Sequence, residues 1–186
     1  MRPQKVDDQQ LMTGLMEVIR SKGFEGASMQ DLAEATGLKK ASLYHRFPGG
    51  KQEITEAVLS FTQRWGAEHI LGVLTDSTKA PKERLSKALQ NVRSLYREGE
   101  AICVLRALTV DPSLPLFAKQ IESSFESWIK GFTILATDMG IEEAKARSMA
   151  IQAVYTIQGS LVVSKGLNDL SIFRQALDSI ETTYSI

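Results

Sequence analysis

The chain has 186 residues with 22 basic and 22 acidic side chains, so its formal net charge at pH 7 is zero. A hydrophobic content of 43% and a charged content of 24% are those of an ordinary soluble globular protein. The net charge of a neutral molecule cannot attract nucleic acid. Any DNA affinity must therefore come from a localised basic patch.

Cysteine and hydropathy indicate the compartment. The single cysteine, Cys103, excludes an intramolecular disulfide and suits a reducing cytoplasm. No apolar run approaches the ~20 residues of a membrane span, and the polar start MRPQKVDDQQ does not resemble a signal peptide. The sequence therefore predicts a soluble cytoplasmic protein.

The first predicted helix covers residues 7–22, where apolar side chains recur at the helical period of 3.6 residues. Gly23 is well placed as the residue that follows the helix, and Phe24 is expected to return to the core. This helix should support the segment that follows it.

Residues 28–51 predict two short helices. Ser28 is a candidate N-cap with Asp31 three residues later, and Gly37 ends the first short helix. Leu43 and Phe47, four residues apart, share one face of the second, which ends at Pro48-Gly49-Gly50. Two short helices joined by a tight turn that contains glycine form a helix-turn-helix.

The second short helix is unusually basic. Between Leu38 and Lys51 the charged residues are all positive: Lys39, Lys40, Arg46 and Lys51. Charge alone also fits a solvated helix in an ordinary bundle. Together with the cap, the turn and the interleaved aromatic side chains, it favours a helix that meets phosphates and base edges.

The remaining elements are helical as well. A helix from about Lys51 to Leu74 contains Gly66 and Gly72, which weaken it and allow bending. Further helices are predicted over 81–98, 116–138, 142–165 and 170–184, with Pro81 in a first turn and Gly166 as a stop. A short apolar segment, AICVLRALTV, precedes the turn at Asp111-Pro112. The predicted fold class is all-α, with about nine helices and no strand.

The segment GLKKASLYHRFPGGKQEI resembles the signature of the tetracycline-repressor (TetR) family of bacterial regulators, and GFEGASMQDLAEATG is similar to its first half. The match covers about residues 8–60. Lys39 stands where the family usually has a small hydroxyl or acidic residue, so this cap is expected to be absent. Tyr44-His45-Arg46-Phe47 replaces a common Tyr-Tyr-His-Phe run, which should alter the bases and phosphates read. The Pro-Gly-Gly-Lys junction resembles an LmrA-like branch.

The resemblance implies a helix-turn-helix domain over residues 1–50 and a helical ligand-binding and dimerisation domain over 51–186. It also implies a two-fold homodimer in which helices 142–165 and 170–184 form a four-helix bundle with their copies. Double-stranded DNA, as a pseudo-palindromic operator, is the expected partner. The expected DNA-contacting residues are Ser28, Lys39, Lys40, Ser42, Tyr44, His45, Arg46 and Lys51.

The family's body holds a mainly apolar ligand cavity, although each large side chain here also fits an ordinary core. The resemblance implies a small hydrophobic effector, and the residues expected to bind it are Trp65, Phe125, Trp128, Tyr155, Gln158 and Arg106.

No residue pattern supports catalysis. His45 and His69 lie in different regions, neither has the spacing of metal ligands, and Cys103 in its apolar segment is expected to be a buried, inert thiol. The sequence therefore predicts no enzyme, no metal and no cofactor. The expected function is a ligand-responsive transcriptional repressor. The alternative is an all-helical scaffolding protein that has a basic head but no sequence-specific operator.

Overall fold

The computed structural model describes residues 7–185. Residues 1–6 of the predicted first domain, and the part of the polar start that they form, lie outside this description. The predicted all-α class is confirmed, and no strand occurs within residues 7–185. No helix in that range is long and apolar enough to span a membrane.

The chain forms two compact units. Unit 1 contains residues up to Thr62 together with Val104–Ile121, and unit 2 contains Gln63–Cys103 together with the chain from Glu122 onward. The boundary predicted after residue 50 separates a DNA-binding domain from a ligand-binding domain, whereas the two units are defined by packing. The predicted boundary therefore stays a prediction. Residues 104–121 belong by packing to the same unit as the helix-turn-helix.

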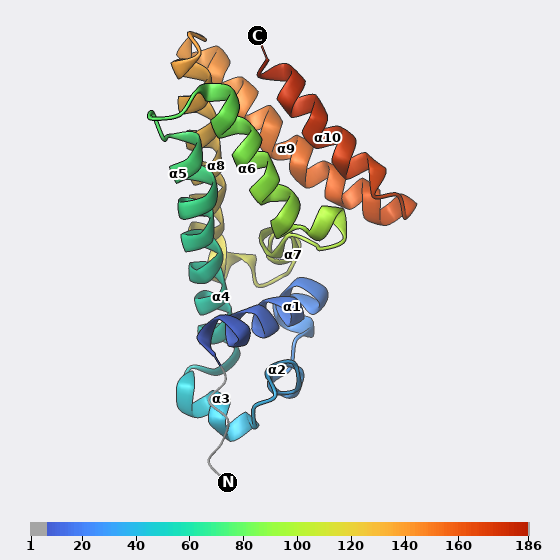
Figure 1. Ribbon diagram of the computed structural model, residues 1–186. Coiled ribbons are helices and arrows are strands. Elements are labelled where there is room, and N and C mark those ends of the chain that lie inside the picture. The colour runs from blue at the N-terminus through green and yellow to red at the C-terminus, as the bar shows by residue number, and fades with distance from the viewer. Residues whose placement is uncertain (1–6, 186) are drawn as a thin grey trace. The chain divides into compact units, whose positions relative to one another are not determined.

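Unit 1 is built around α1 (Asp8–Gly26), against which α2 (Met29–Thr36) and α7 (Val104–Thr109) pack (Figure 1). It also contains α3 (Lys40–Arg46), the start of α4 (Gly50–Gly66) and the first turns of α8 (Leu114–Asp138). Gly23, with a φ of 68°, interrupts α1 near its end, as expected of a glycine that terminates a helix. The core of the unit is a set of fully buried aliphatic side chains: Leu15, Ile19, Leu32, Leu43, Ile54 and Val58.

The predicted helix over 51–74 is not a regular α-helix throughout. After α4 the chain forms a π-helical segment, Ala67–Leu71, followed by the short α5 (Gly72–Leu74). The π-helical segment lies directly between Gly66 and Gly72, the two glycines at which bending was predicted. Wider π-helical turns are rare and mark places where a helix accommodates a local constraint.

Two predicted helix ends were wrong. The helix α6 (Pro81–Leu95), which has its proline in the first turn as predicted, ends before residue 98 because Arg97 and Glu98 both have positive φ values. The helix α9 (Glu143–Leu167) continues through Gly166 and ends instead at Asn168, which adopts the left-handed conformation with a φ of 51°. Asparagine tolerates that conformation better than other non-glycine residues, so it can replace glycine at a helix C-terminus.

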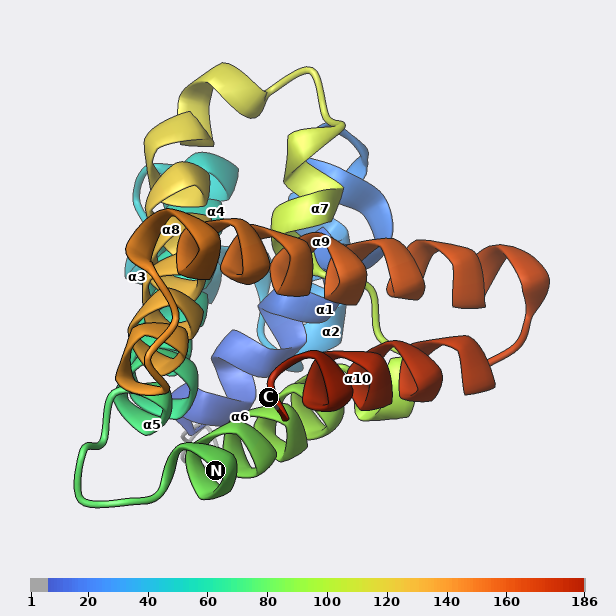
Figure 2. The same cartoon turned by 90° about the horizontal axis from the view of Figure 1, so that it is seen from above.

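In unit 2, α9 and α10 (Ser171–Thr183) lie side by side and antiparallel, with α6 next to α10 (Figure 2). Of the small and aliphatic residues of α9 that suggested an interface, Gly159 and Val162 are exposed, and the others are buried within the chain itself: Ala146, Ala150, Ala153, Val154, Ile157 and Leu161. They form the core beneath α9. An interface on this helix must therefore use its opposite face.

Candidate nucleic-acid interface

The first half of the helix-turn-helix is fixed by a reciprocal cap. The Asp31 backbone N–H donates to Ser28 Oγ over 3.1 Å, and the Ser28 backbone N–H donates to the Asp31 carboxylate over 2.9 Å. A hydrogen bond from Lys22 Nζ and others from the Ser28 hydroxyl and N–H lower the pKa of Asp31 to about 2. The capping box that the sequence predicted is therefore present and carries a stabilised carboxylate.

The turn places α3 with one face inward. Gly37 adopts the left-handed conformation, with a φ of 66°, and its N–H bonds back to the end of α2. Leu43 is fully buried beneath α3, and Phe47 is half-buried at its end. Lys39 occupies the N-cap without a side-chain hydrogen bond, as expected from its departure from the family pattern. Ser42, Tyr44 and His45 are exposed.

The four predicted cations of this window differ in their surroundings. Within the described part of the chain, Lys39 and Lys40 are exposed and have no ion-pair partner. Arg46 forms an ion pair with Asp8. Lys51, one of the expected DNA-contacting residues, lies half-buried with Nζ 4.4 Å from the centre of the Phe24 ring. The basic character of the sequence therefore overstates the number of unpaired cations on this surface.

A second contact in this unit has no signal in the local sequence pattern. The Asp111 carboxylate, which precedes α8, accepts hydrogen bonds from the Glu25 N–H over 3.2 Å and from Ser113. Burial raises the pKa of Asp111, but hydrogen bonds from Ser113, Glu25 and Phe24 outweigh it and leave the pKa below its usual value. The Phe117 ring packs edge to face against the Phe24 ring, with the ring centres 5.2 Å apart. The turn at Gly23 is therefore held by residues almost 90 positions away, a contact that no local pattern reveals.

The expected effector residues lie in several environments. Trp65 is half-buried and stacks on His69 with the ring centres 4.7 Å apart. Trp128 is buried, and its Nε1 lies 2.8 Å from the position that a Cβ on Gly66 would occupy. Trp128 therefore packs closely against α4 at Gly66, the residue that follows Trp65.

The other four are dispersed. Gln158 donates to the Tyr96 hydroxyl over 3.2 Å, while its own buried amide oxygen has no partner among the described residues. Phe125 is half-buried on α8. Arg106 is half-buried on α7 in unit 1. Tyr155 is 59% exposed on α9, which indicates a surface rather than an enclosed pocket.

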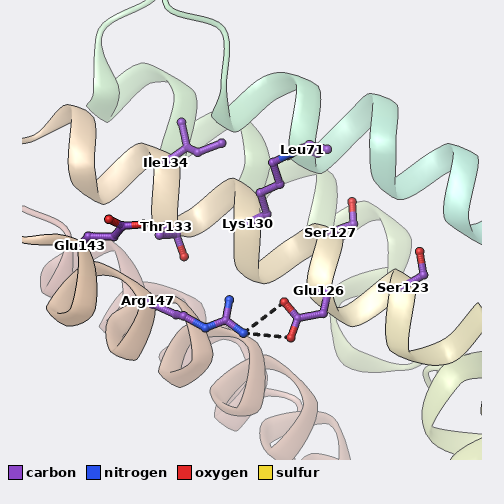
Figure 3. A pocket seen from close by; sticks show the side chains of 9 residues that line it. All are labelled: Leu71, Ser123, Glu126, Ser127, Lys130, Thr133, Ile134, Glu143 and Arg147. Atoms are coloured by element: carbon purple, nitrogen blue, oxygen red, sulfur yellow. Dashed lines mark hydrogen bonds and ion pairs between the residues drawn. The ribbon is translucent and has the colours of Figure 1, made fainter. Parts of the chain in front are cut away.

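A cleft of about 650 Å³ opens between α8 and α9 in unit 2, and none of the six expected effector residues lines it (Figure 3). Arg147 on α9 forms an ion pair there with both carboxylate oxygens of Glu126 on α8, at 3.0 and 3.2 Å. The other residues that line the cleft mostly have hydroxyl or charged side chains. Within residues 7–185, no group of three or more histidine, cysteine or acidic residues is arranged to hold a metal ion.

Comparison with known proteins agrees with this geometry. Residues 11–58 match the family of bacterial regulatory proteins called tetR, and residues 81–179 match the C-terminal domain of LmrA/YxaF-like transcriptional regulators. An HTH-type transcriptional regulator in the lacX 3' region of Lactococcus lactis is 23% identical over 95% of this chain and 92% of its own. The HTH-type transcriptional regulator LmrA of Bacillus subtilis is 20% identical, over 84% and 85% of the two chains.

Solved structures show the same fold. A TetR transcriptional regulator from Legionella pneumophila superposes with a TM-score of 0.83 at 20% identity, over 98% of this chain and 99% of its own. A cysteine variant of the TetR family regulator CifR, solved with 26 bp double-strand operator DNA, gives a TM-score of 0.69 at 22% identity over 95% and 98% of the chains. A helix-turn-helix at the N-terminal end, followed by a matching regulatory domain over most of the remaining chain, places the protein in the tetR family of transcriptional regulators, within its LmrA/YxaF-like branch.

Proposed function

We propose that this regulator binds a double-stranded operator through α3 and releases it when a hydrophobic small molecule occupies unit 2. The observation that carries the proposal is the two-sided character of α3. Its inner face is anchored by the buried Leu43, while its outer face exposes Lys40, Ser42, Tyr44 and His45 without an acidic side chain of its own. A short helix that is rigidly seated and has a cationic, aromatic outer face suits the major groove.

The exposed side chains divide by chemistry. Lys39 and Lys40 supply point charges for phosphates, and Arg46 can do so once it leaves Asp8. Ser42 and His45 carry polar groups that can meet base edges, and Tyr44 offers both a hydroxyl and a ring for a thymine methyl. Backbone donors at the start of α2, behind Ser28, add a site for a phosphate. In this proposal Lys51 contributes chiefly by fixing the start of α4 against Phe24.

A second copy of the chain is the proposed partner of α9. One stripe on the exposed side of this helix is continuous and uncharged, with the charged residues Lys145, Arg147 and Lys165 exposed outside it. The stripe consists of Ala144, Ser148, Ile151, Gln152, Tyr155, Gly159, Val162 and Gly166. A Cβ on Gly159 or Gly166 would meet nothing within 4 Å in its own chain. Glycine there is explained if another helix approaches closely, and a two-fold axis would place two α3 helices on successive major grooves.

The proposed effector site lies around Trp65 and Trp128, beside the π-helical segment. Because α4 begins in unit 1 and ends in unit 2, occupancy and DNA affinity should be coupled reciprocally, typically by ~1–3 kcal/mol. An effector should therefore change tryptophan fluorescence and release DNA over the same concentration range.

Footprinting with fragments of the source genome at low salt tests the DNA function. A specific regulator protects a short, pseudo-palindromic site at protein concentrations that leave other fragments unprotected. A helical scaffolding protein with a basic head would bind all fragments weakly and alike. Absence of any protected site would refute the proposal.

A further inference from the structure

The helix α3 carries an ion pair that must open before one of its cations can contact a phosphate. Arg46, the last residue of α3, pairs with Asp8 in the first turn of α1, so the contact joins elements 38 positions apart. Both side chains are accessible, with Asp8 82% and Arg46 41% exposed. The pair therefore lies on the surface of unit 1, at one end of the helix proposed to meet DNA.

We propose that Asp8 is an intramolecular competitor of DNA, a carboxylate that occupies the Arg46 guanidinium in the free protein and lowers the affinity for duplex DNA. The inference rests on the proposed DNA-binding function and adds a residue that limits its strength. A carboxylate is planar and a phosphate is tetrahedral, but a guanidinium binds either of these oxyanions with paired hydrogen bonds. One can therefore replace the other on Arg46.

The helix dipole explains an acidic residue in the first turn of α1, but it does not explain why this carboxylate pairs with α3. An exposed ion pair contributes little to folding, because water screens it and two long side chains lose freedom. Asp7, not Asp8, occupies the N-cap of α1, and the buried Leu43 already anchors α3. Nor does Asp8 merely continue an acidic surface, since residues 38–51 contain no acidic side chain. Asp8 brings a negative charge from another helix to α3, which has no acidic side chain of its own.

The consequence for DNA binding follows from charge. A phosphate that approaches Arg46 must displace Asp8, so part of the phosphate contact is offset by the loss of the ion pair. Removing the charge of Asp8 frees Arg46 for one more phosphate contact. Each phosphate that is neutralised steepens the salt dependence of log K by about 0.9 per unit of log[salt].

The test compares two adjacent, exposed carboxylates. Asp8→Asn and Asp7→Asn change the net charge equally, but within residues 7–185 only Asp8 pairs with α3. Full-length proteins are titrated with a 30 bp duplex of random sequence between about 50 and 200 mM salt, the range over which phosphate contacts dominate binding. We expect Asp8→Asn to bind about three- to fivefold more tightly at the lower salt, the factor that releasing one exposed ion pair allows. Its salt slope should be steeper by about 0.9, while Asp7→Asn stays near wild type.

Arg46→Gln supplies the second arm. It should bind more weakly than wild type, and adding Asp8→Asn to it should give no further gain, because the competitor has lost its target. Equal affinities for Asp7→Asn and Asp8→Asn would overturn the inference, as would a gain that persists without Arg46. Weaker binding by Asp8→Asn would show that Asp8 positions Arg46 and would also overturn it. If neither wild type nor Asp8→Asn bound any duplex, the DNA-binding proposal itself would fail.

Discussion

Single side chains on α3 differ in what they can contribute, and the cations show this most clearly. Lys40 is exposed and has no ion-pair partner among residues 7–185, whereas Arg46 and Lys51 both contact groups of their own chain. The sequence shows which side chains are basic but not which groups of the chain they contact. Asp8 and Phe24 reach α3 and α4 only through tertiary packing, which leaves no trace in local spacing.

Lys40→Ala should weaken binding to all duplexes nearly uniformly and reduce the salt slope by about 1, because one phosphate contact is lost without a change in base reading. Lys87→Ala is the matched control, since Lys87 is an exposed lysine on α6 in unit 2. Fluorescence anisotropy at several salt concentrations measures both. If Lys87→Ala reduced the salt slope of DNA binding as much as Lys40→Ala does, the proposed phosphate contact of Lys40 would be contradicted.

Asp31 gives a prediction about pH. Its pKa in the folded state, about 2, lies below its ordinary value of 3.8, chiefly because Lys22 and Ser28 donate hydrogen bonds to the carboxylate. A depressed folded-state pKa adds stability that is present above the ordinary value and is lost as the pH falls toward 2. Asp31→Asn should therefore be less stable than wild type at pH 7, with the difference shrinking between pH 4 and pH 2. Urea unfolding at several pH values checks this, and a difference that grows on acidification would contradict it.

At the scale of elements, the sequence predicts best where the signal is local. The Ser28 cap, the Gly37 turn, the proline at the start of α6 and the interruption between Gly66 and Gly72 all follow from residues within a few positions. The end of α9 was missed because glycine is not the only residue that adopts the left-handed conformation. The local sequence pattern also could not predict that residues 104–121 pack in the same unit as the helix-turn-helix.

Gly66 tests the junction between α4 and the π-helical segment. A Cβ there would lie 2.8 Å from Trp128 Nε1, so Gly66→Ala should destabilise unit 2 by about 1–3 kcal/mol despite the better helix propensity of alanine. Gly26→Ala, where a Cβ would make only an ordinary contact with Lys22 Cβ at 3.5 Å, should instead be neutral or stabilising by up to about 1 kcal/mol. Chemical unfolding of both variants measures the contrast. A stabilised Gly66→Ala protein would mean that Trp128 moves aside at little cost.

At the scale of the whole molecule, the amount of apolar surface on α9 and α10 suggested assembly, but sequence alone could not divide it between core and interface. The structure assigns Ala153 and Leu161 to the core and leaves the stripe through Tyr155 and Val162 exposed. Sequence periodicity could not separate these faces because α9 is apolar on both sides. The proposed dimer therefore rests on the outer face alone.

Val162→Lys and Leu161→Lys separate the two faces with one substitution type at adjacent positions. Val162 is 44% exposed and Leu161 only 6%. Val162→Lys should remain folded but sediment as a monomer, because the charge would be buried only in the dimer. Leu161→Lys should lose its fold or become insoluble, because the charge would be buried in the core of its own chain. Folded dimers of Val162→Lys at micromolar concentration would place the interface elsewhere.

The central claim is that α3 reads DNA sequence as one of two symmetric recognition helices. Its most direct test is selection of binding sites from a pool of random duplexes, carried out in parallel with wild type and His45→Ala. Wild type should enrich a pseudo-palindrome whose half-sites are about one helical turn, or a small multiple of it, apart. His45→Ala should enrich the same spacing with altered base preference at one pair of symmetric positions, since only a base-facing contact is removed. Enrichment of no motif by wild type would contradict the claim. So would a variant in which Ser42, Tyr44 and His45 are all replaced by alanine and which still enriches the wild-type motif.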